Sequence, residues 1–177
     1  MKSLFTALLV LVLAASLFAD PFNKGDKIAQ VGIGYGFAFY TGSGGIPPIS
    51  LGFQYGLEKK ISIGGIIGYT SSTEKWGWHN DNWEWKYTYI IIGARGEYHF
   101  LEDSENIDAY AGLTLGYYIV SVTTPAGYND FGYSTGASSA LFGAHVGARY
   151  YFSPKFAAFG ELGYGVGYIT VGVAFKL

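Results

Sequence analysis

Large apolar residues alternate with glycine and small polar residues along most of the chain. In the stretch 31–39, Val, Ile, Tyr, Phe and Phe occupy the odd positions, and glycine or alanine occupies the even ones. Alternation with a period of two is typical of a β-strand whose two faces lie in different surroundings. The pattern recurs in the stretches 49–57, 61–69, 92–100, 108–119, 142–152, 158–164 and 169–177. The sequence therefore predicts eight strands.

The lengths and connections of these strands favour a membrane barrel. Tilted strands of roughly 9–11 residues cross a bilayer, and most of the predicted strands reach that length. Short connections at 58–60, 101–106 and 153–155 alternate with long ones at 40–48, 70–86 and 121–138, although the last connection, 165–168, is short. Short turns at one end and longer loops at the other are typical of outer-membrane barrels. We therefore expect residues 20–177 to form an all-β, eight-stranded antiparallel up-and-down transmembrane β-barrel.

A water-soluble barrel with its apolar face inside is the alternative. Only 14% of the 177 residues are charged and 19% are aromatic, whereas soluble domains carry about 25% charge. The bulky apolar face is also too large to fit inside eight strands. We expect the glycine-rich face to line the lumen and the apolar face to meet lipid. Outward aromatic residues near the strand ends are typical of membrane-interface girdles: Tyr98, Phe100, Tyr150, Phe152, Phe156 and Phe175 near the short turns, and Phe39, Tyr69, Tyr117 and Tyr164 near the long loops.

The first 19 residues have the features of a secretory signal peptide. A positive start at Lys2 precedes the apolar run 4–18, and Ala19 then precedes Asp20. The run is shorter than the roughly 20 residues of a membrane-spanning helix. We expect a cut after Ala19, with a cut after Ser16 as the alternative, and export across the inner membrane.

The overall charge and the absence of cysteine exclude several classes of function. A formal net charge of −2 excludes a basic nucleic-acid binder. The lack of cysteine excludes disulfide frameworks, cysteine-based zinc sites and thiol catalysis.

Two runs and the last strand carry a resemblance to a known family. These are Gly-Ala-Arg-Gly-Glu-Tyr-His-Phe at 93–100, Gly-Ala-Arg-Tyr-Tyr-Phe at 147–152, and an aromatic final strand that ends in Leu177 rather than Phe. The chain resembles small eight-stranded outer-membrane proteins of the OmpA/OmpX kind. The resemblance implies the outer membrane of a Gram-negative-type bacterium, contact with outer-membrane lipid, and delivery by the barrel assembly machinery. It implies no activity and no cofactor.

Four charged residues on the glycine-rich face share one height in the predicted barrel. Arg95, Glu97, Arg149 and Glu161 lie at similar distances from the short turns. Buried charges must be paired, and arginine can bind carboxylates through two hydrogen bonds. We expect an ionic layer that plugs the lumen and fixes the strand register. The alternative is a gate on a proton or ion path.

All four tryptophans lie within ten residues, at 76–85. If Ile61 pairs with Phe100, then Trp78 lies opposite Trp83 and Trp76 opposite Trp85, with a turn at 79–82. Cross-strand aromatic pairs stabilise hairpins. We expect an extended hairpin above the outer surface that serves as an aromatic platform for a host surface, a glycan or a protein partner. The alternative is a hairpin whose tryptophans only stabilise it.

The histidines do not form a recognisable catalytic or metal motif. His79, His99 and His145 are distant from one another and lack ligand spacing, and no His-x-Ser motif is present. We therefore expect no catalytic residue, no metal and no cofactor. The leading prediction is a non-enzymatic outer-membrane barrel with a structural or adhesive role. A narrow channel or a route for small hydrophobic molecules is the alternative, and an enzyme acting on lipids ranks third.

Overall fold

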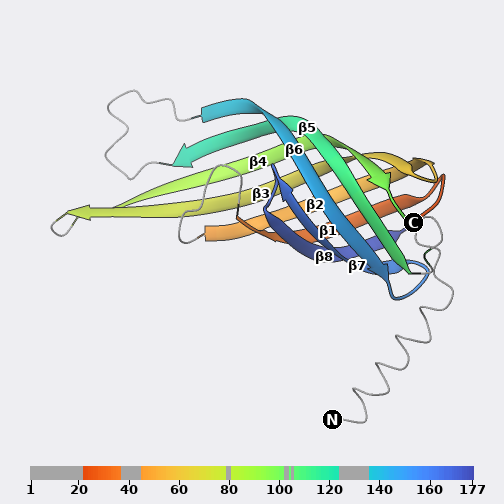
Figure 1. Cartoon of the computed structure of the whole chain (residues 1–177). Coiled ribbons are helices and arrows are strands. Elements are labelled where there is room, and N and C mark those ends of the chain that lie inside the picture. Colours follow the sequence, from red (N-terminus) through yellow and green to blue (C-terminus); the bar gives the residue numbers. More distant parts are fainter. Residues whose placement is uncertain (1–21, 37–44, 79–80, 102–103, 105, 124–135) are drawn as a thin grey trace, which may run out of the picture.

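The chain forms a closed antiparallel barrel of eight strands (Figure 1). The computed structural model describes residues 22–36, 45–78, 81–101, 104, 106–123 and 136–177. Each strand pairs with the next, and the last pairs with the first, so the predicted fold class is confirmed. The strands are β1 (Lys27–Tyr35), β2 (Gly45–Glu58), β3 (Ile61–Trp78), β4 (Asp81–His99), β5 (Ile107–Thr123), β6 (Gly136–Tyr151), β7 (Phe156–Tyr164) and β8 (Ile169–Lys176). Among the described residues, no helix is long and apolar enough to span a bilayer.

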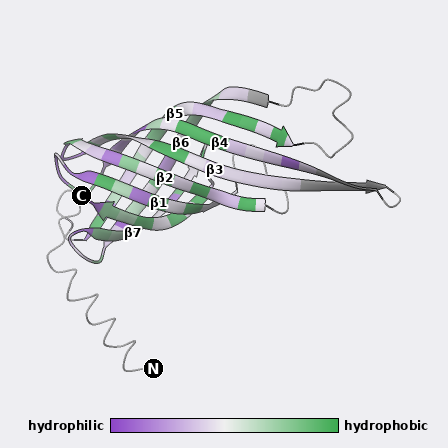
Figure 2. Ribbon diagram, turned by 180° about the vertical axis from the view of Figure 1, so that it is seen from behind, coloured by the Kyte–Doolittle hydropathy of each residue, from purple (hydrophilic) through white to green (hydrophobic). Residues whose placement is uncertain are grey.

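The predicted alternation corresponds to an outer and an inner face. Along β7, Phe156 and Leu162 face outward and are exposed, whereas Phe159 and Glu161 face inward and are buried. Figure 2 shows hydrophobic segments repeated around the barrel body. An apolar surface of this extent is unfavourable in water and suits a lipid environment. Of the predicted girdle residues, Tyr98, Phe100, Tyr150, Phe156, Tyr69, Tyr117 and Tyr164 are exposed, and Phe39 lies outside the described residues.

The strands differ in length, and their bounds differ from the predicted ones. β1 (Lys27–Tyr35) begins four residues before the predicted start at 31, and residues 37–39 of the predicted strand lie outside the described residues. β2 already begins at Gly45, inside the predicted loop 40–48. β3 to β6 have 16–19 residues, whereas β1, β7 and β8 have 8 or 9. Polar residues follow one another where β3 leaves the apolar belt, at Ser71, Ser72 and Thr73. Hydrophobic alternation fades there although backbone pairing continues, which is why the pattern underestimated the strand lengths.

The predicted pairing of β3 with β4 is wrong by two residues. Ile61 lies opposite Tyr98, not Phe100. The amide of His99 donates a hydrogen bond to the carbonyl of Lys60, so the ladder ends one residue before Phe100. A shift by two residues keeps every side chain on its own face, so alternation alone cannot detect it.

This register also changes the predicted tryptophan pairs. Trp76 lies opposite Trp83, Trp78 opposite Asp81, and Trp85 opposite Glu74. The predicted four-residue turn at 79–82 is therefore also wrong, because Asp81 and Asn82 belong to β4. His79 and Asn80 lie outside the described residues. One cross-strand tryptophan pair replaces the two that were expected.

Candidate functional site: a buried ionic network in the lumen

The structure brings the four predicted lumen charges together. Arg95 and Glu97 come from β4, Arg149 from β6 and Glu161 from β7, and all four point inward. Each is at most 8% exposed. They share one height because strand tilt and register place these positions at one level of the lumen. Nearby inward positions such as Gly112 and Gly147 have no side chain, which leaves room for the long charged ones.

Arg149 is the centre of the network. Its guanidinium donates to Asp108 Oδ2 at 2.8 Å, Glu97 Oε2 at 2.9 Å and Gln30 Oε1 at 3.0 Å. The guanidinium carbon also lies 3.9 Å from the ring centroid of Tyr110. The planar, multidentate donor suits this position, where a lysine ammonium could not reach all three acceptors with the same geometry. Arg149 therefore joins β1, β4, β5 and β6 across the lumen.

Arg95 and Glu161 form the second centre. Arg95 donates to both oxygens of Glu161, at 3.0 and 3.3 Å. Glu161 Oε1 also accepts hydrogen bonds from the hydroxyl of Tyr110 at 2.9 Å and from the amide of Gln30 at 3.3 Å. Gln30 and Tyr110 contact both centres, so the two arginines belong to one connected network.

Asp108, His99 and Ser62 extend the network toward the short turns, a part that the sequence prediction missed. His99 Nδ1 lies 2.6 Å from Asp108 Oδ1, and His99 Nε2 lies 3.0 Å from Ser62 Oγ. The order of groups is that of a serine hydrolase. All three side chains are at most 1% exposed, however, and the ring of Phe22 stacks on His99. Within the described residues the hydroxyl is therefore shielded from solvent, and the three side chains tie β3, β4 and β5 together.

Two apolar clusters enclose the network along the barrel axis. Toward the short turns lie the buried residues Phe22, Ile28, Tyr151, Ala157, Phe159 and Ala174. Toward the long loops lie Tyr89, Ile91 and Leu141, with Tyr87, Tyr118, Val120 and Val166 packed against them. The described lumen is therefore layered, with an apolar cluster at each side of a polar centre.

The segment just before β1 contributes the seal at the short-turn end. Its amide at Gly25 donates to the carbonyl of Gly56, and the amide of Gly56 donates to the carbonyl of Asp26. Asp26 also lies 2.8 Å from Lys176 Nζ on β8. These contacts hold Phe22 against the lumen, where it occupies space beside Gly56.

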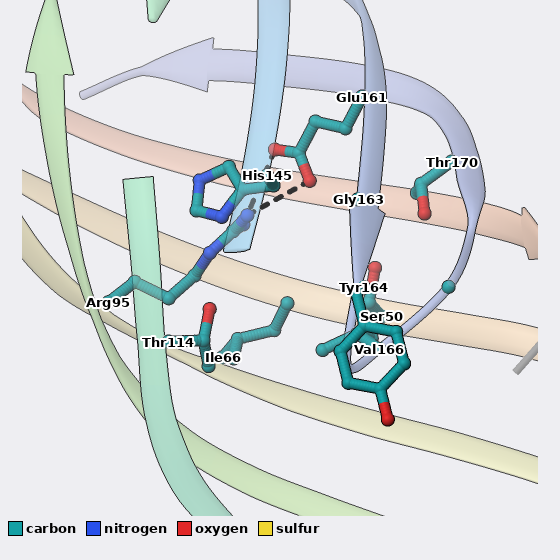
Figure 3. Close-up of a pocket in the computed structure, with 11 residues that line it drawn as sticks. Ser50, Ile66, Arg95, Thr114, His145, Glu161, Gly163, Tyr164, Val166 and Thr170 are labelled. Atoms are coloured by element: carbon teal, nitrogen blue, oxygen red, sulfur yellow. Dashed lines mark hydrogen bonds and ion pairs between the residues drawn. The ribbon is translucent and has the colours of Figure 1, made fainter. Parts of the chain in front are cut away.

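A cavity of about 20 Å³ lies at the edge of the network, toward the short β7–β8 connection (Figure 3). Its ionisable lining residues are Arg95, His145 and Glu161, and Figure 3 shows their side chains converging from β4, β6 and β7. The remaining lining residues are Ser50, Ile66, Thr114, Gly163, Tyr164, Val166, Gly167 and Thr170. A space of this size can hold one water molecule.

The predicted tryptophan site lies away from this network. β3 and β4 pair with each other as far as Trp78 and Asp81, beyond the last β2–β3 pair at Ser72 and the last β4–β5 pair at Lys86. Figure 1 shows this two-stranded ribbon extending away from the barrel body. Its backbone carries Trp76, Trp78, Trp83 and Trp85.

Comparisons with known proteins identify the fold and no closer relationship. No protein-family model matches the chain, and comparison with curated protein sequences finds no match. Among solved structures, the chain is similar to the outer membrane protein OprG from Pseudomonas aeruginosa, with a TM-score of 0.66 and 12% identity over 90% of this chain and 99% of that one.

Two further structures support the same fold. The complex of Ail, the attachment invasion locus protein of Yersinia pestis, with the heparin analogue sucrose octasulfate has a TM-score of 0.52 and 14% identity, over 86% of this chain and 95% of Ail. The N-terminal β-barrel domain of Pseudomonas aeruginosa OprF has a TM-score of 0.50 and 15% identity, over 87% of this chain and 98% of that domain. The resemblance expected from the sequence is thus confirmed: the chain has the fold of the small eight-stranded outer-membrane barrels.

Proposed function

We propose that this protein is a non-enzymatic barrel of a Gram-negative-type outer membrane, with a structural or adhesive role. After export and removal of residues 1–19, the barrel assembly machinery would insert the protein so that the projecting ends of the long strands lie on the outer side of the membrane. The exposed apolar belt supports a lipid environment, and the layered lumen supports an anchor rather than a pore. The projecting β3–β4 ribbon is the part available to an extracellular ligand or host surface.

The filled lumen is the observation that carries this proposal. Arg149 is fully buried and bound to Asp108 and Glu97, with apolar clusters on both sides of the network. Opening a path would leave these charges without partners, which costs several kcal/mol. The channel alternative is therefore disfavoured.

Planar-bilayer recording of the refolded barrel tests this point. We expect no single-channel currents from the wild type. Replacing Arg95 and Glu161 together by alanine removes one ion pair, and it should raise conductance only if the channel alternative holds, because the two apolar clusters still close the lumen of an anchor. Steady currents from the wild type would support the channel alternative instead.

The projecting ribbon supports an adhesive role. Beyond Ser72 and Lys86, β3 and β4 have no described pairing with β2 or β5. A ribbon that served only to close the barrel would not need to extend this far. Binding of cells that display the protein to host-cell surfaces should fall when Trp76 and Trp83 are both changed to alanine. Unchanged binding, with the barrel still folded, would remove the adhesive part of the proposal.

The charge of the ribbon bears on the class of ligand. Residues 73–86 contain Glu74, Asp81 and Glu84 against Lys75 and Lys86, a small negative excess. The sulfated heparin analogue bound by Ail is strongly anionic, and such ligands require basic surfaces. We therefore favour an uncharged glycan or an apolar protein surface, for which tryptophan is a suitable contact. Retention of the protein on immobilised heparin at physiological salt would contradict this choice.

A further inference from the structure

His145 has a buried ring nitrogen that the network leaves unsatisfied. The residue is 8% exposed, and its Nε2 atom has no hydrogen-bond partner. Arg95 Nε, which belongs to another residue lining the same cavity, is also without a partner. Buried polar atoms nearly always have one. The Arg95 Nε–H group is a donor that a water molecule in the cavity can satisfy, whereas the His145 nitrogen can bind a metal ion.

Two carboxylates converge on that nitrogen. One ligand atom each from Glu97, His145 and Glu161 lies within 4.8 Å of the others. His145 Nε2 lies 3.4 Å from Glu97 Oε1 without forming a hydrogen bond. Zinc–ligand bonds of about 2.0–2.1 Å place neighbouring donors of a tetrahedral shell about 3.4 Å apart. The observed separation therefore matches two donors on one metal ion.

We propose that Glu97, His145 and Glu161 bind one first-row transition-metal dication, with Zn²⁺ as the representative. One imidazole nitrogen and two carboxylate oxygens are common ligands of such ions, whereas Mg²⁺ and Ca²⁺ prefer oxygen alone. The three residues come from β4, β6 and β7, so no spacing in the sequence could reveal the site.

Glu97 can take up the ion without leaving Arg149, whereas Glu161 has to exchange its contacts with Arg95 for the ion. Glu97 holds Arg149 through Oε2, while its Oε1 faces His145 and also accepts a hydrogen bond from Gln54 Nε2 at 2.7 Å. A carboxylate oxygen has a second lone pair that can bind the ion. The cavity beside His145 and Glu161 has room for one water molecule as the fourth ligand. The hydroxyl groups of Ser50 and Thr114 also line that cavity and can hydrogen-bond the water.

The charge of the network leaves room for a cation, and Arg95 is the group that competes with it. Glu97, Asp108 and Glu161 oppose only two guanidiniums, so the network carries one excess negative charge when its histidines are neutral. Arg95 Nη1 lies 3.9 Å from Glu97 Oε1 and 3.3 Å from Glu161 Oε1. Arg95 Nη2 also donates to Glu161 Oε2 at 3.0 Å, so the ion has to displace this guanidinium from Glu161.

The test is zinc retention by barrels refolded in detergent. All samples carry His79→Ala, which leaves His99 and His145 as the two histidines, and each is checked for folding by its gel mobility with and without boiling. After exposure to Zn²⁺ and removal of free metal, we expect about one zinc per barrel. His145→Ala should lose the zinc. His99→Gln is the matched control and should keep it, because both His99 nitrogens are occupied by Asp108 and Ser62.

Arg95→Gln and a cobalt spectrum complete the test. Removing the competing guanidinium should raise zinc affinity by about tenfold or more. Co²⁺ in place of Zn²⁺ should give visible absorption bands of a tetrahedral site, and these should be absent from folded His145→Ala. Folded barrels that retain no zinc would overturn the proposal, as would equal retention by His145→Ala. Zinc binding in Arg95→Gln alone would also overturn it, because the natural chain would then have no site.

Discussion

The phenyl ring of Phe22 lies flat against the imidazole of His99, with ring centroids 3.6 Å apart and ring planes 5° from parallel. Through this contact the segment before β1 covers the polar network at the short-turn end. The contact joins residues far apart in the sequence, one from the N-terminal segment and one from the end of β4. It makes the N-terminal segment part of the core rather than a tail.

Phe22→Ala should therefore destabilise the barrel. Truncating a buried phenylalanine costs about 3 kcal/mol, because apolar contacts are lost and a cavity remains. Urea unfolding in lipid vesicles, followed by tryptophan fluorescence, measures the free energy of unfolding. Phe22→Leu, which keeps most of the volume, should lose much less. Equal stability of Phe22→Ala and the wild type would show that the segment is not part of the core.

Arg149→Lys should be strongly destabilising although the charge is kept. The ammonium cannot replace hydrogen bonds to Asp108, Glu97 and Gln30 at once, and leaving a buried carboxylate poorly paired costs about 3–5 kcal/mol. The unfolding midpoint in urea should fall markedly. Lys24→Ala is the control, because it removes an exposed ion pair with Glu58 and should leave the midpoint unchanged. Similar midpoints for both variants would contradict a central role for Arg149.

Two glycines near one another on β6 and β7 should respond differently to alanine. A Cβ at Gly147 would lie 2.8 Å from both Glu161 Cγ and Tyr110 Cζ, inside the packed network. Overpacking of this kind costs about 1–3 kcal/mol. A Cβ at Gly160 meets no atom within 4 Å, so Gly160→Ala should be neutral or slightly stabilising. The measurement is the free energy of unfolding of each variant. If Gly147→Ala is as stable as Gly160→Ala, the lumen around Gly147 is loosely packed.

The β3–β4 register can be tested with paired cysteines, because the natural chain has none. Trp76→Cys with Trp83→Cys places the two thiols on directly opposed residues, where a disulfide can form. Trp78→Cys with Trp83→Cys tests the register that the sequence predicted. In the structure these two positions are diagonal neighbours, which lie about 7–8 Å apart. Mass spectrometry after mild oxidation should find the first cross-link and not the second. The reverse result would restore the predicted register.

An arginine in the apolar belt should show where the membrane lies. Leu113 is 66% exposed and lies midway along the outward apolar positions of β5. Leu113→Arg should cost about 2–4 kcal/mol in a bilayer, the value for arginine near the midplane. Ser121→Arg on the same strand, beyond the belt, should cost little. If both variants unfold like the wild type in vesicles, the belt does not face lipid.

The sequence predicted the facing of the strands better than their pairing. Alternation placed Arg95, Glu97, Arg149 and Glu161 inside because inward and outward residues differ in size and polarity. It could not distinguish registers that differ by two residues, since both satisfy the same alternation. In the structure Ile61 lies opposite Tyr98, and the amide of His99 donates to the carbonyl of Lys60 at the end of this pairing. The alternation pattern carries no information about this backbone hydrogen bond.

The extent of the network was also beyond the sequence pattern. Asp108 and His99 fall on the predicted inner face, but their contact depends on how β4 and β5 are staggered. Phe22 lies outside every predicted strand, so alternation gave no reason to place it in the lumen. Contacts between distant strands require the barrel register, and a single sequence does not contain it.

The seam between β1 and β8 has a consequence for the timing of folding. Val31 lies opposite Val173, so closure joins the first strand made to the last. Until β8 has joined β1 and β7, the partial sheet has two open edges, which lipid does not tolerate. Loop closure over nearly the whole chain is also slow. Stable insertion therefore requires β8, because a chain without Ile169–Lys176 leaves the edges of β1 and β7 unpaired.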